Sequence, residues 1–155
     1  MLWGDDGAGP AVIESLRRQI APSPNLLLID AGHAPENILG QVIRFAPTHV
    51  IYVDAIRSSD EPGAIHWLMP SEVEDIGGST HMISLGMLAD YIEANTSAKV
   101  FVAGIQPGPM ILAEGLSHEV DQAAIELARG IAGYWRKAMT ACSAISSGAV
   151  SEVSN

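Results

Sequence analysis

Two short runs of almost continuous apolar residues constrain the fold of this chain most. They are THVIYVDA (48–55) and AKVFVAGI (98–105), both rich in valine. Strands that are apolar on both faces are typical of a parallel sheet covered by helices on both sides. LLLID (26–30) predicts a further buried strand. AIHWLM (64–69), which follows a Pro-Gly turn, predicts a strand that runs back beside 48–55.

Segments with helical periodicity alternate with these strands. The first lies at 10–20, where Pro10 suits the first helical turn and the apolar residues fall on one face: Val12, Ile13, Leu16 and Ile20. Further helices are predicted within 31–45, at 82–96 and at 118–139. Strands that alternate with helices in this way indicate an α/β protein.

We therefore predict a single α/β domain over residues 1–139. Its sheet is expected to be twisted and mostly parallel, with helices on both faces and one antiparallel edge strand. Residues 140–155 are rich in Ser, Ala and Gly, and are predicted to form a flexible tail.

The composition excludes several classes of function. The 8 basic and 18 acidic residues give a net charge of −10, which repels phosphate backbones, so we expect no nucleic-acid partner. No run reaches the roughly 18 apolar residues that a membrane span needs. The single cysteine, Cys142, excludes an internal disulfide and a cysteine-cluster metal site, and favours a cytoplasmic protein.

Several polar side chains are predicted to meet at one rim of the sheet, because ligands of such sheets bind beyond the carboxyl ends of the strands. Asp30 and Asp54 each end a predicted strand. Asp5 and Asp6 lie in the turn before the first helix, and His81 follows a Gly-Gly-Ser-Thr loop just before another helix. Two carboxylates and an imidazole can hold a divalent first-row metal and leave positions open for water or substrate. Helix caps, turn formers and surface residues are the alternative interpretation of the same side chains.

Five segments in order carry a resemblance to a known family: GDDGAGP (4–10), IDAGHAPEN (29–37), IYVDA (51–55), STH (79–81) and VAGIQP (102–107). Together they are similar to the hydrogenase maturation endopeptidases, in particular to the branch that processes hydrogenase-3-type large subunits. The resemblance spans about residues 3–136.

The resemblance implies a cytoplasmic α/β endopeptidase of the aspartyl type. Such an enzyme removes a short C-terminal extension from the precursor of a nickel–iron hydrogenase large subunit after nickel has been inserted. The matching positions imply Asp6, Asp54 and His81 as metal ligands, and Asp30 as a residue of cleavage or recognition. The implied metal is nickel, either carried by the precursor or bound at the site, and no nucleophile is assigned.

Two other functions stay open at this point. One is a non-catalytic or inactive binding protein on the same fold that holds the precursor or a metal. The other is a small-molecule hydrolase or transferase that uses the same rim, although no constellation of nucleophile and base supports it.

The start of the chain departs from the family pattern. Family members carry an apolar strand before the acidic turn, whereas only Met1, Leu2 and Trp3 precede Gly4 here. We therefore expect the usual first strand to be largely missing from the sheet. The interpretations are a start that lies upstream, which we favour, a truncated chain that closes its sheet differently or borrows a strand, and an inactive relative.

Overall fold

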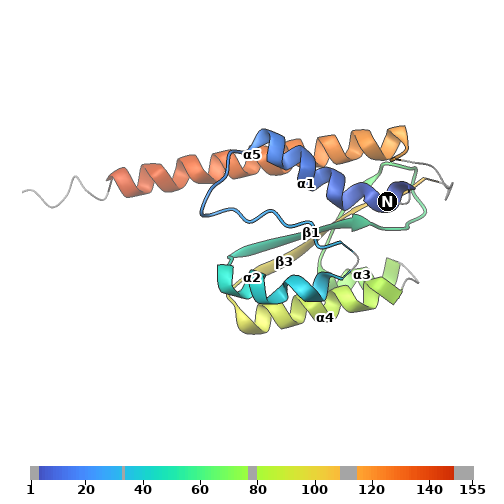
Figure 1. The fold of residues 1–155 in the computed structure, drawn as a ribbon, viewed down its shortest axis with the longest axis horizontal. Helices are drawn as coiled ribbons and strands as arrows, with labels where there is room; N and C mark the ends of the chain where they lie inside the picture. The colour runs from blue at the N-terminus through green and yellow to red at the C-terminus, as the bar shows by residue number, and fades with distance from the viewer. Residues whose placement is uncertain (1–3, 33, 77–79, 109–114, 149–155) are drawn as a thin grey trace, which may run out of the picture.

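A computed structural model of the chain describes residues 4–32, 34–76, 80–108 and 115–148. Within these residues a three-stranded sheet has the order β1-β3-β2 (Figure 1). β1 (His49–Ala55) and β3 (Lys99–Ile105) are parallel, and β2 (Ile65–Leu68) runs antiparallel to β3. The predicted α/β class and the antiparallel edge strand are confirmed. The prediction that this edge strand lies beside 48–55 is wrong, because β2 pairs with β3 and not with β1.

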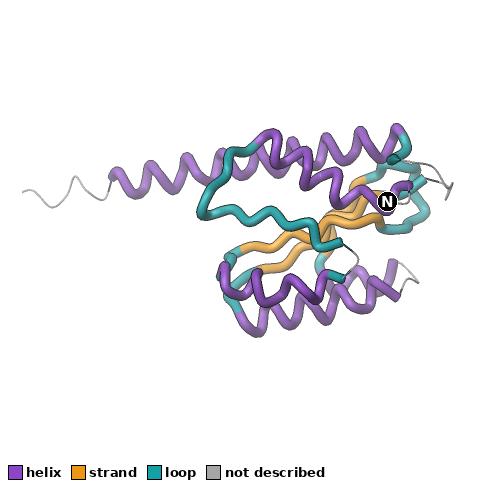
Figure 2. The backbone as a smooth tube through the Cα atoms, in the orientation of Figure 1, coloured by secondary structure: helices purple, strands orange, loops and turns teal. Residues whose placement is uncertain are grey.

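Helices cover both faces of the sheet (Figure 2). On one face lie the 3-10 turn η1 (Gly4–Gly7), α1 (Ala8–Gln19) and α5 (His118–Gly148). On the other lie η2 (Pro35–Ile38), α2 (Leu39–Phe45), α3 (Pro70–Ile76) and α4 (Thr80–Asn95). α3 was not expected from the sequence. Its start is stabilised by Glu72, whose carboxylate accepts the Met69 N–H at 2.6 Å as in one half of a capping box.

Alternate side chains of the strands enter different cores. Val53 and Ile105 pack into the core formed with α1 and α5. Tyr52 and Val102 pack on the opposite face, where Val73 of α3 and Leu85 of α4 complete the core. Successive side chains of a strand point to opposite faces. The residue two positions after Tyr52, at the end of β1, therefore faces the layer of α3 and α4.

The predicted strand at 26–30 is wrong. An isolated bridge between Ser23 and Leu26 is the only strand pairing that involves this segment among the described residues. Its side chains still pack as those of a strand would, with Leu28 against the core of α1 and α5 and Ile29 against the core of α2 and α4. The described sheet ends at β1, and no backbone hydrogen bond runs from 26–30 to that strand, so the segment is not part of the sheet. The described residues before α1 form the 3-10 turn η1 and no strand, and residues 1–3 lie outside the described part.

The last helix is longer than predicted. α5 continues through Gly148 and extends beyond the sheet, so residues 140–148 of the predicted flexible tail are helical (Figure 1). Hydroxyls within this stretch donate one turn back along the helix, from Thr140 to the Arg136 carbonyl at 2.9 Å and from Ser143 to the Met139 carbonyl at 3.0 Å. Residues 149–155 lie outside the described part. No helix of that part has the length and hydropathy to cross a membrane.

Candidate functional site

Three chain segments that carry predicted metal ligands come to one end of the sheet. The start of α1, the carboxyl end of β1 and the start of α4 lie at the same end of the molecule (Figure 1). Asp6 lies in η1, Asp54 lies near the end of β1, and His81 is the second residue of α4. The backbone therefore brings Asp6 and Asp54 to one rim of the sheet, and α4 begins at the same end of the molecule. The side chain of His81 lies outside the described part of the structure.

A close backbone contact joins the first two of these segments. A Cβ atom on Gly9 would lie 2.6 Å from the carbonyl oxygen of Val53, so a residue without a side chain is needed for this approach. Gly9 comes three residues after Asp6, and Val53 comes just before Asp54. The first turn of α1 consequently rests directly on β1, and the acidic turn is held beside the end of that strand.

The two carboxylates at this rim have different surroundings. Asp6 is exposed, whereas Asp54 is half-buried and accepts the Ala55 N–H at Oδ1 over 2.8 Å. Gly104 is the register partner of Asp54 on β3, and the side chain of Ile56 fills the space that a side chain at Gly104 would take. Asp54 thus stands beside an apolar wall, with one oxygen already fixed in direction.

Carboxylate oxygens and an imidazole suit divalent first-row metals, so the donor chemistry fits such an ion. Among the residues that the structure describes, no three metal-ligating side chains form a group that could hold one. The His81 side chain is not among the described ones. The site of Asp6, Asp54 and His81 therefore stays a prediction.

Asp30 lies outside regular structure and not at the end of a strand. It is exposed, and its Oδ1 accepts the Gly32 N–H at 3.0 Å. Gly32 has a φ of +58°, which glycine adopts without strain. Asp30 therefore forms the turn that leads toward η2, and its part in cleavage or recognition stays a prediction.

Asp5 has a role that was not expected from the sequence. Its half-buried carboxylate accepts hydrogen bonds from the N–H of Gly108, the N–H of Ser117 and the Ser117 hydroxyl, at 2.7, 2.7 and 3.0 Å. We call these three residues the Asp5 clasp. Its donors are more than 100 residues away along the chain, so local spacing gives no sign of them. The one available signal is Ser117 itself, a typical helix-capping residue just before α5.

A second polar cluster, also missed, lies beside the rim and comprises Ser58, Asp60, His66 and Gln106. The Ser58 N–H and hydroxyl both donate to the side-chain oxygen of Gln106. The Nε2 of His66 lies 3.2 Å from Ser58 Oγ and 3.3 Å from Asp60 Oδ2. This cluster ties the connector between β1 and β2 to the residue that follows β3.

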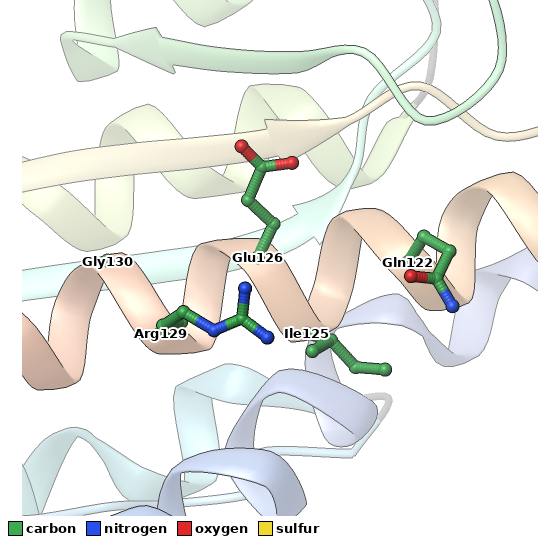
Figure 3. Close-up of a pocket in the computed structure, with 5 residues that line it drawn as sticks. All are labelled: Gln122, Ile125, Glu126, Arg129 and Gly130. Carbon is green, nitrogen blue, oxygen red and sulfur yellow. The ribbon is translucent and has the colours of Figure 1, made fainter.

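A shallow hollow lies elsewhere, on α5 (Figure 3). All of its lining residues come from this one helix: Gln122, Ile125, Glu126, Arg129 and Gly130. In the close-up, the carboxylate of Glu126 points away from the guanidinium of Arg129. Side chains that do not converge cannot enclose a small ligand, so we assign this hollow no function.

Comparisons with known proteins identify the family of this chain. A family model described as HycI hydrogenase maturation protease matches residues 10–133. The chain is 35% identical over 107 residues to the hydrogenase 3 maturation protease of Escherichia coli (strain K12), a match that covers 68% of this chain and 67% of that protein.

Solved structures of hydrogenase maturation proteases also resemble this chain. The crystal structure of a NiFe hydrogenase maturation protease HycI from Thermococcus kodakarensis KOD1 superposes with a TM-score of 0.77 at 32% identity, over 85% of this chain and 84% of that one. The solution structure of an endopeptidase HycI from Escherichia coli gives a TM-score of 0.72 at 28% identity, over 86% and 84% of the two chains. The predicted resemblance is confirmed: the chain belongs to the hydrogenase maturation protease family and is a peptidase.

Proposed function

We propose that this protein is an endopeptidase that removes the C-terminal extension from the large-subunit precursor of a nickel–iron hydrogenase, after nickel has been inserted and in the cytoplasm. Membership of the maturation protease family supports the reaction class. The observation that carries the assignment to this rim is the contact of Gly9 with the Val53 carbonyl, because it holds the turn of Asp6 beside the strand end of Asp54.

In this proposal Asp6, Asp54 and His81 are the protein's ligands for nickel, which the precursor brings as part of the substrate. Nickel bound there would polarise the scissile carbonyl and lower the pKa of a bound water to about 7. Asp6 is exposed and can meet an incoming metal-loaded protein. Asp54 is held in one orientation by the Ala55 N–H. Cleavage then depends on whether the precursor carries its metal.

Asp30 is proposed as a contact for the precursor chain, since it is exposed and its turn is fixed by Gly32.

The enzyme is proposed to be of the aspartyl type, with carboxylates and not a thiol at the site. Cys142 lies 24 residues after His118 on α5. At a helical rise of 1.5 Å per residue it is about 36 Å along the axis from the helix start, which borders the Asp5 clasp. A thiol at that distance cannot reach the rim.

The test compares nickel-loaded with nickel-free precursor and detects the shortened subunit by mass. We expect cleavage of the loaded form only. Asp6→Asn, Asp54→Asn and His81→Ala should each abolish it, because each removes one ligand. Asp90→Asn is the matched control, since Asp90 is exposed on α4 and lies outside the site. Undiminished processing by His81→Ala would refute the proposed ligand set.

The same experiment addresses a non-catalytic binding protein on this fold. Such a protein would retain the precursor without shortening it. The relatives described above are named as proteases or endopeptidases, and nothing in them favours the binding function.

A further inference from the structure

The Asp5 clasp joins three distant parts of the chain. Oδ2 of Asp5 accepts the Gly108 N–H at 2.7 Å and the Ser117 hydroxyl at 3.0 Å, and Oδ1 accepts the Ser117 N–H at 2.7 Å. Gly108 comes shortly after β3, and Ser117 directly precedes α5. One carboxylate therefore fixes η1 against both of these segments, and both of its oxygens are engaged in doing so.

The clasp suits a carboxylate and not an amide. All three partners donate, and an ionised carboxylate is purely an acceptor. The N-terminus of α5 also favours a negative charge, because the backbone N–H groups and the helix dipole point toward it. A Cβ on Gly108 would lie 3.1 Å from Oδ2 of Asp5, so a glycine is what allows this short approach. An asparagine at position 5 would turn its NH₂ group toward donors.

Asp6 directly follows Asp5 in the four-residue turn η1. On one side the turn is fixed by the clasp. On the other it is fixed by Gly9, whose backbone lies against the Val53 carbonyl. The position of the Asp6 backbone at the rim is thus set by contacts that lie outside the rim itself.

We propose that Asp5 is the positioning residue of this site: the clasp holds Asp6 where it can ligate nickel together with Asp54, and Asp5 itself is not a ligand. The inference rests on the proposed function. It assigns separate roles to the two acids of the GDDG turn, one inside the fold and one at the reaction site.

The test measures kcat and KM for cleavage of nickel-loaded precursor by Asp5→Asn, at a temperature well below the Tm of the variant. We expect kcat to fall about 10- to 100-fold, the usual effect of losing a residue that orients a metal ligand, with KM close to that of the wild type. Asp121→Asn is the matched control. It makes the same substitution in the first turn of α5, at an exposed residue outside the clasp, and should keep wild-type kcat.

A second variant covers the case in which Asp5→Asn does not fold. Ser117→Ala removes the hydroxyl bond and leaves both backbone bonds to Asp5, so we expect a folded protein with a smaller loss of kcat. The double variant should lose no more than Asp5→Asn alone, because both substitutions act on one unit.

Wild-type kcat in folded Asp5→Asn overturns the inference, as does wild-type kcat in Ser117→Ala if Asp5→Asn is unfolded. A variant with a lower Tm but unchanged kcat would show that the clasp serves stability alone. If the wild-type protein leaves nickel-loaded precursor uncut, the proposed function fails and the inference fails with it. Cleavage by the wild type separates the two failures.

Discussion

Replacing Gly9 with alanine tests how closely α1 rests on β1. The new Cβ would lie 2.6 Å from the Val53 carbonyl oxygen, and the atom it meets is backbone, which cannot rotate away. Contacts between carbon and oxygen are comfortable at about 3.3 Å, so helix and strand must separate by about 0.7 Å. Overpacking of this kind costs about 1–3 kcal/mol. The alanine returns at most about 1 kcal/mol of helix propensity, so at full return Gly9→Ala should lower the free energy of unfolding by about 0–2 kcal/mol.

Gly130→Ala is the matched control for this variant. Gly130 is also helical, and a Cβ there would meet no atom within 4 Å. It should therefore gain helix propensity without a clash and stabilise the protein by about 0.5–1 kcal/mol. Thermal unfolding followed by circular dichroism measures both, and a change of 1 kcal/mol shifts the Tm of a chain of this size by about 2–4 °C. Gly9→Ala should shift the Tm downward and Gly130→Ala upward.

Gly9→Ala should also reduce cleavage, because it moves the turn of Asp6 away from the end of β1. Equal upward shifts of the Tm in the two glycine variants would refute the close approach of α1 to β1. The placement of Asp6 beside the end of β1 would then lose its main support.

Three further substitutions can be measured by urea unfolding. Gly104→Ala should destabilise the protein by about 1–3 kcal/mol, because its Cβ would lie 2.5 Å from Cδ1 of the buried Ile56; adding Ile56→Val should recover part of the loss. Gln106→Leu should cost about 1–3 kcal/mol, since it leaves the Ser58 N–H without its acceptor. Tyr52→Phe should leave stability at neutral pH unchanged or raise it, because the buried Tyr52 hydroxyl has no hydrogen-bond partner among the described residues. Burial also raises the pKa of Tyr52, so at high pH the folded state keeps a proton that the unfolded state loses. The free energy of unfolding of the wild type should therefore fall as the pH rises above about 10, and that of Tyr52→Phe should fall less.

Elements with a strong local pattern were predictable from the sequence. The apolar β-branched residues of 48–55 and 98–105 predicted β1 and β3 to within one residue, because such runs satisfy both faces of a covered strand. The helical face of 10–20 predicted α1, which begins only slightly earlier, at Ala8. Periodicity reports which side chains are buried, and for these elements that information was sufficient.

Pairing between strands was not predictable in the same way. Leu28 and Ile29 are packed against opposite helical layers, as their apolar character predicted, yet their segment pairs with no described strand beyond the Ser23 bridge. The antiparallel strand β2 was predicted beside β1 and lies beside β3. Burial of a side chain does not identify the partner of its backbone, and that partner depends on segments far away in the sequence.

The candidate site, too, was predictable from the sequence only in part. Asp6 and Asp54 could be expected at one rim, because strand ends and helix starts meet there in an α/β sheet. The clasp of Asp5 and the contact of Ser58 with Gln106 could not, since they join segments that only the completed fold brings together. Long-range hydrogen bonds of this kind leave no local period in the sequence.

The two adjacent acids cannot exchange roles, and the geometry of their turn gives the reason. η1 is a 3-10 turn, in which neighbouring side chains diverge by about 120°. When Asp5 is directed into the fold toward Ser117 and Gly108, Asp6 must be directed elsewhere, and it is the exposed one of the two. A single acid could not accept three hydrogen bonds from the fold and also leave its oxygens open to a metal. A pair in consecutive positions can supply both of the proposed roles, because the contacts of Asp5 fix the backbone on which Asp6 lies.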